Sequence, residues 1–191
     1  MTARWVVDVV QPARDATINW EPISLLFKNQ PSEDSDYFAP VNHTHKLLRV
    51  FESVKAEGGN DDAFAFYWEA GRNIHHDGNW EIDAAKILQN AGLDAKHAKA
   101  FDDDSYDAGI DEKMNAGLAL TGHDVGTPII AFNSPTKPDE KVGIFGPVIS
   151  RVPQGEEGLA LWDAMVTMST MDGFWELKRT RTVGPEFGHR P

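Results

Sequence analysis

The dipeptide Thr127-Pro128 is the part of this 191-residue sequence whose residue types say most about chemistry. It follows Gly126 and opens an apolar run that is typical of a β-strand. A proline there removes a donor from the hydrogen-bond ladder, and a cis peptide bond is one way to accommodate it. The alternative is a proline that starts the strand in the ordinary trans form. The residues alone leave both forms open.

The sequence contains no cysteine. This absence excludes a disulfide scaffold, a Cys-ligated metal centre and a thiol nucleophile within these residues. The motifs GxSxG, GxxxxGK[ST] and GxGxxG are absent as well. No catalytic residue is therefore predicted in the chain, and we expect it to be inactive by itself as a thiol redox enzyme.

Seven histidines raise the question of a metal site. Zinc needs three or four converging ligands, and only two pairs of histidines are close in sequence, His43 with His45 and His75 with His76. Neighbouring side chains on a helix point in different directions, so His75 and His76 do not easily face one ion. No metal site and no bound cofactor are predicted.

Acidic residues outnumber basic ones, 30 against 18, which gives a formal net charge of −12. Binding of nucleic acid relies on clustered Lys and Arg, so this balance argues against it. No stretch approaches the roughly 18 apolar residues of a membrane-spanning helix, and the amino-terminal residues lack the features of a signal peptide. We expect a cytoplasmic protein without nucleic-acid or membrane partners. The oligomeric state is not predicted.

The elements expected before the hairpin are an opening helix, a strand and a long helical region. Apolar residues at near-helical spacing predict a helix that Pro12 closes. Alternation predicts a strand over 17–25, at a sheet edge because it contains Pro22. A polar loop over 29–42 then leads into helices from 43 to about 122, interrupted at Gly58-Gly59.

After residue 122 the pattern changes. Two short apolar runs, 125–133 and 141–146, predict a β-hairpin joined through 134–140. A last helix is expected from Gly155, and the basic tail is expected to pack in its first half and fray in its second. The order of elements indicates an α/β or α+β domain with a large helical insertion.

Four segments together resemble the DsbA family of thioredoxin-fold oxidoreductases. They are GRNIHHDGNWEID (71–83), HDVGTPIIAFN (123–133), FGPVISRVPQGEEGLALWD (145–163) and FWELKRTRT (174–182). More narrowly, they are similar to the actinobacterial branch of mycothiol-dependent nitroreductases. The similarity covers nearly the whole chain, and the segment 145–163 with the KRTRT tail is specific to this branch.

The resemblance implies an α/β thioredoxin-like fold with a large all-helical insertion. The thioredoxin-like domain would comprise 1–28 and 123–191, and 29–122 would form a linker loop and a helical lid. Thr127 and Pro128 match the family's cis-proline, which faces bound thiol substrates, so the resemblance favours the cis form. The family's first strand and its Cys-x-x-Cys segment have no counterpart in the chain. A late start at Met1 is the hypothesis that explains this, and the in-frame DNA upstream tests it.

The implied function is that of a DsbA-like thiol-disulfide oxidoreductase or mycothiol-dependent reductase, with mycothiol as co-substrate and a small molecule or thiol as partner. Thr127 and Pro128 would shape the site, and Asn29 would offer a polar contact to substrate. The aromatic run 66–68 fits either a substrate pocket or the core. Two alternatives stay open: a non-catalytic protein that binds thiols or small ligands, and a degenerate relative that dimerises. The physiological substrate is not predicted.

Overall fold

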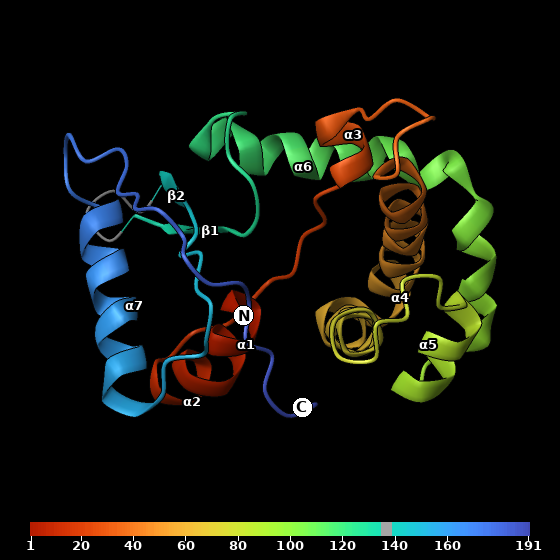
Figure 1. Ribbon diagram of the computed structural model, residues 1–191, viewed down its shortest axis with the longest axis horizontal. Helices are drawn as coiled ribbons and strands as arrows, with labels where there is room; N and C mark the ends of the chain where they lie inside the picture. Colours follow the sequence, from red (N-terminus) through yellow and green to blue (C-terminus); the bar gives the residue numbers. More distant parts are fainter. Residues whose placement is uncertain (135–138) are drawn as a thin grey trace. The chain divides into compact units, whose positions relative to one another are not determined.

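A computed structural model describes residues 1–134 and 139–191 of the chain. The structure is mixed α/β and mostly helical, and its described residues form one two-stranded sheet (Figure 1). Residue contacts divide the chain into two compact units, 1–18 with 116–188 and 19–115 with 189–191. The domain division expected from the sequence, after residues 28 and 122, stays a prediction.

The first unit begins with a continuous helical segment built from α1 (Thr2–Trp5), the π-helical turn η1 (Val6–Val10) and α2 (Gln11–Ala13). The segment ends one residue after Pro12, where Arg14 becomes extended. Its apolar face is buried as the spacing predicts, and it packs with Met165 of the last helix, α7 (Gly155–Ser169). The buried residues of this face are Trp5, Val6, Val9 and Val10.

The predicted hairpin is confirmed. Strands β1 (Ile129–Asn133) and β2 (Lys141–Phe145) pair antiparallel, with Ile129 opposite Phe145. The middle of the expected connection, residues 135–138, lies outside the described residues. The last helix starts at Gly155, also as expected, and α7 contacts both β2 and η1.

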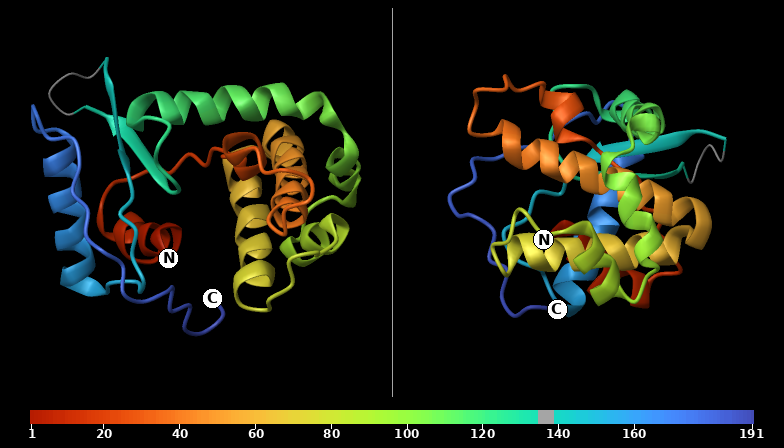
Figure 2. Two further views of the ribbon diagram at one scale, coloured as in Figure 1. Left: turned by 45° about the horizontal axis from the view of Figure 1, so that its top comes forward. Right: turned by 90° about the vertical axis from the view of Figure 1, so that its right-hand side faces the viewer.

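The second unit contains helices and no strand among its described residues, and its last helix continues to Thr121 in the first unit. The helical region expected from 43 to 122 is thus confirmed. Helix α4 begins earlier than expected and bends at Gly59, whose φ of 77° and ψ of −162° are not helical. The two halves of α4 appear as separate cylinders, orange before the bend and yellow after it (Figure 2). The elements are α3 (Leu25–Asn29), α4 (Phe38–His75), α5 (Ala84–Ala91), η2 (Ala95–Asp102), η3 (Asp104–Tyr106) and α6 (Asp107–Thr121).

The strand expected over 17–25 is wrong. Residues 16–24 form neither a helix nor a strand, and they pair with no strand in the described part of the chain. The main chain of Trp20 is satisfied by side chains of α4 instead: its N–H donates to Asn60 Oδ1 at 2.8 Å, and its carbonyl accepts from Lys55. Its ring packs on Phe64 at 5.3 Å between centroids. A helix thus takes the place that a neighbouring strand was expected to fill.

The expectation for the tail is also wrong, because the order is reversed. The first half is exposed, with Trp175 at 89% and Leu177 at 77% of their full accessibility. The second half makes main-chain hydrogen bonds: Glu186 N–H donates to Ser150, and Arg4 donates to the carbonyl of Phe187. Specific polar partners, rather than apolar burial, hold this part of the tail.

Candidate functional site

The Thr127-Pro128 loop leads directly into β1. The peptide bond between the two residues is cis. Thr127 is exposed and Pro128 is half-buried, and the carbonyl of Pro128 accepts a hydrogen bond from Gly146 N–H at 2.8 Å. Within the described residues, the main-chain N–H and C=O of Thr127 form no hydrogen bond. The loop therefore presents one exposed residue whose main chain is available to a ligand.

A second X-Pro dipeptide, Gly146-Pro147, lies against this loop, and the sequence pattern did not single it out. The bond between Gly146 and Pro147 is also cis, and the carbonyl of Pro147 accepts from Thr2 Oγ1 at 2.6 Å. The start of the opening helical segment is thus linked through 146–147 to Pro128. A Gly-Pro dipeptide directly after a predicted strand was the available indication.

Asn29, the third predicted site residue, belongs to the other unit. It is the last residue of α3 and is exposed. Its Nδ2 donates to the hydroxyl of Tyr37 at 3.2 Å, and Tyr37 is itself 42% exposed. The structure therefore adds Tyr37 to the candidate polar surface. Nothing in the sequence pattern distinguishes Tyr37 from an ordinary loop tyrosine.

The sequence left two roles open for the aromatic run 66–68, a place in the core and a place in a substrate pocket, and its residues differ in burial. Phe66 is buried in the core of the helical unit, whereas Tyr67 is 40% exposed. The ring of Tyr67 lies 5.2 Å from that of Trp20. Phe66 is thus a core residue, whereas Tyr67 belongs to a partly exposed aromatic contact with Trp20.

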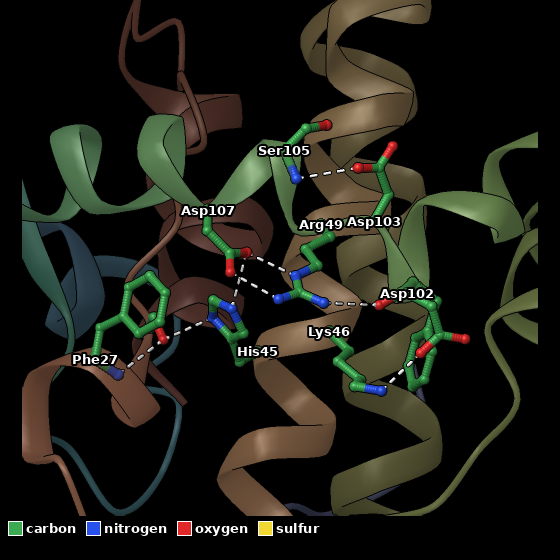
Figure 3. Close-up of polar contacts among 10 residues, drawn as sticks. Phe27, His45, Lys46, Arg49, Asp102, Asp103, Ser105 and Asp107 are labelled. Carbon is green, nitrogen blue, oxygen red and sulfur yellow. Dashed lines mark hydrogen bonds and ion pairs between the residues drawn. The ribbon is translucent and has the colours of Figure 1, made fainter.

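A buried polar network joins three elements of the helical unit around His45 (Figure 3). His45 Nδ1 lies 2.9 Å from Ser24 Oγ, and Nε2 lies 3.1 Å from Asp107 Oδ1. The carboxylate also accepts two hydrogen bonds from Arg49, at 2.6 Å from Nε and 2.7 Å from Nη2. Ser24 is completely buried, so this spatial arrangement of Ser, His and Asp side chains does not present a nucleophile to substrate. Its role is to hold elements together.

Burial sets the charge states of this network. It lowers the pKa of His45 below the ordinary 6.5, although the charge of Asp107 acts in the opposite direction. Burial raises the pKa of Asp107, but hydrogen bonds from Arg49 and His45 and the positive charge nearby outweigh it and bring that pKa below 3.8. At neutral pH the network therefore holds an ionised carboxylate and a neutral imidazole.

A family model described as "Rv2466c-like: Mycothiol-dependent nitroreductase Rv2466c" matches residues 1–179. The chain belongs to this family. The match confirms the mycothiol-dependent branch of the resemblance, and the wider DsbA assignment stays a prediction.

Among residues 1–134 and 139–191 of this Rv2466c-like chain, no group of three or more His, Asp or Glu side chains lies close enough together to hold a metal ion. His43 and His45 serve different contacts. His43 Nε2 lies 3.1 Å from the carbonyl of Ile82, whereas His45 belongs to the buried network. In the described parts of the chain, no helix is long and apolar enough to cross a bilayer.

Proposed function

We propose that the chain binds mycothiol at the Thr127-Pro128 loop and takes part in mycothiol-dependent reduction of a small molecule such as a nitro compound. Membership of the Rv2466c-like family supports the reaction class. The exposed main chain of Thr127, which forms no hydrogen bond within the described residues, is the observation that carries the site. An unpaired N–H and C=O suit the amide groups of a thiol substrate.

The electron balance defines what these residues contribute. Reducing a nitro group to a nitroso group takes two electrons and two protons and releases water. Two thiols supply both when they are oxidised to one disulfide. Because the chain has no cysteine, each thiol oxidised on these residues comes from mycothiol. The residues present thus bind and orient the thiol, and they carry no electrons themselves.

The opening helical segment belongs to the same compact unit as the loop. Its first residue contacts the loop region through Thr2 Oγ1 and the Pro147 carbonyl. In a thioredoxin-like domain over 1–28 and 123–191, which we propose for this chain, the loop and the helix start would be parts of one site.

Asn29 is proposed as a further polar contact for the substrate. Its side-chain amide, beside the Tyr37 hydroxyl, offers a donor and an acceptor on an exposed surface. Asn29 belongs to the segment proposed as a helical lid, 29–122, and Thr127 and Pro128 belong to the thioredoxin-like part.

Calorimetric titration with reduced mycothiol tests the proposal. Pro128→Ala releases the fixed φ of the loop, and we expect a roughly fivefold weaker affinity, equivalent to about 1 kcal/mol of extra ordering. Pro12→Ala is the matched control, because Pro12 is exposed and lies at the end of the opening segment. Saturable binding that only Pro128→Ala weakens supports the site. Equal affinities for the two variants, or no binding to the parent chain, would overturn it.

A second candidate is a non-catalytic thiol-binding protein, which the lack of cysteine favours. The two candidates separate in a turnover assay that follows loss of a nitroaromatic compound in the presence of mycothiol, with and without the chain. Acceleration by the chain identifies a reductase. Saturable binding with the uncatalysed rate identifies a binding protein.

A further inference from the structure

Helix α3 is too short to maintain its own position. It spans five residues, Leu25–Asn29, and none of them is fully buried. Isolated helices shorter than about 12 residues are marginal in water. The placement of its last residue, Asn29, must therefore come from contacts at other points of α3.

The strongest of these contacts lies at the first turn of α3. Ser24 caps the helix, because its Oγ accepts from Phe27 N–H at 3.1 Å. The same Oγ lies 2.9 Å from His45 Nδ1 on α4, and the ring centroids of Phe27 and His45 are 4.3 Å apart. One histidine of α4 thus contacts both the cap and the first turn of α3.

The protons of this network have a single consistent arrangement. The carboxylate of Asp107 is ionised and can only accept, so His45 Nε2 is the protonated nitrogen and donates to it. Nδ1 is then an acceptor and takes the hydroxyl proton of Ser24. A lone pair of Ser24 Oγ remains for Phe27 N–H. Each hydrogen bond fixes the direction of the next.

We propose that His45 is a positioning residue for Asn29: its Nδ1 accepts from Ser24 of the α3 cap and its ring packs on Phe27, and through these contacts with α4 it holds α3 and the Asn29–Tyr37 pair in place. The charged groups that face His45 are Asp107 from α6 and Arg49 from α4 itself, whereas Ser24 and Phe27 on the α3 side are neutral. That Asn29 contacts the thiol rests on the proposed function. That His45 holds α3 does not.

Two substitutions of His45 separate its two hydrogen bonds. His45→Asn keeps an amide near the position of Nδ1 and can still accept from Ser24, whereas His45→Gln keeps an amide near Nε2 and faces Asp107. The measurement is hydrogen exchange at Phe27 N–H by NMR, relative to amides of α5. We expect exchange about fivefold faster in His45→Gln, as for loss of a helix cap, and within twofold of the parent in His45→Asn. Equal exchange in both variants would overturn the proposal.

A serine pair provides the matched control. Ser53 Oγ lies 2.8 Å from His97 Nδ1, so Ser53→Ala breaks a bond of the same kind that does not involve α3. Ser24→Ala should accelerate exchange at Phe27 about fivefold, and Ser53→Ala should leave it unchanged. If both variants accelerate it equally, α3 merely reports general stability and the proposal is wrong.

Mycothiol titration of the same variants separates this inference from the proposed function. If His45→Gln loosens α3 and weakens mycothiol binding, while His45→Asn does neither, His45 positions Asn29 for the thiol. If α3 loosens and the affinity stays that of the parent, His45 still holds α3, but Asn29 is not a thiol contact and that part of the proposed function fails.

Discussion

The main-chain N–H of Gly146 donates to the carbonyl of Pro128 at 2.8 Å, one residue before the β-ladder begins with Ile129 opposite Phe145. This bond extends the main-chain pairing of the hairpin by one residue, to Pro128, and the pairing ends there. The main chain of Thr127, the next residue outward, forms no hydrogen bond within the described residues. The sheet thus fixes the inner half of the loop and leaves its exposed half without a main-chain partner among the described residues.

Acid should weaken the helical unit through His45. Its pKa is below 6.5 in the folded chain because of burial, so the unfolded chain binds this proton more readily. The free energy of unfolding should therefore fall as the pH drops below about 6.5. Above that value His45 does not contribute to the pH dependence of this free energy. Urea unfolding of the parent chain and of His45→Phe between pH 7.5 and 5 measures the difference. Identical pH dependence in the two proteins would show that His45 does not contribute.

The guanidinium of Arg49 should not be replaceable by an ammonium group. Arg49 makes two parallel hydrogen bonds to Asp107, and both side chains are largely buried. Arg49→Lys keeps the charge but loses one of the two bonds, and we expect about 1–2 kcal/mol of destabilisation. Arg151→Lys is the control, because Arg151 pairs with Glu157 in the same two-bonded manner at an exposed site. Arg151→Lys should leave the urea midpoint unchanged, and similar midpoints for the two variants would contradict the argument.

Two helical glycines should respond in opposite directions to alanine. A Cβ on Gly158 of α7 would lie 2.7 Å from the carbonyl oxygen of Pro153 and 2.8 Å from Cγ1 of Val9. Gly158→Ala should therefore cost about 1–3 kcal/mol through overpacking. A Cβ on Gly71 of α4 would meet nothing within 4 Å, so Gly71→Ala should stabilise the chain by about 0.5–1 kcal/mol. Thermal unfolding of both variants measures the two effects. A stabilised Gly158→Ala variant would show that α7 packs less closely than described.

The sequence predicts elements well where one local periodicity decides them. The buried face of the opening helix, the hairpin and the start of α7 at Gly155 all follow from apolar spacing and turn residues. The interruption at Gly59 also follows from a local preference, since its φ of 77° favours glycine.

The segment 17–25 shows that periodicity does not identify the structural partner of a segment. Its alternation is real, because Trp20, Pro22 and Ser24 are more buried than their neighbours. Alternation indicates an extended chain with one covered side, but not what covers that side. Here the side chains of Asn60 and Lys55 on α4 satisfy the main chain of Trp20, so no ladder forms. An extended segment covered by a helix and one paired with a strand show the same alternation in sequence.

The candidate site was predictable only in part, for a related reason. Thr127 and Pro128 are neighbours, and their residue types point to this dipeptide but leave the cis and trans forms open, so that only the family resemblance favours a site there. The His45 network joins residues 21 and 62 positions apart in sequence, so only the folded chain shows it. The Asn29–Tyr37 contact likewise depends on how the loop between α3 and α4 folds.

The claim that the Thr127-Pro128 loop binds mycothiol is tested most directly by NMR. Reduced mycothiol is titrated into the ¹⁵N-labelled chain, and the amide signals are followed. We predict saturable shifts that are largest at Gly126, Thr127 and Ile129 and that require a roughly fivefold higher thiol concentration in Pro128→Ala. Shifts centred away from this loop, or a Pro128→Ala titration that coincides with that of the parent chain, would contradict the account.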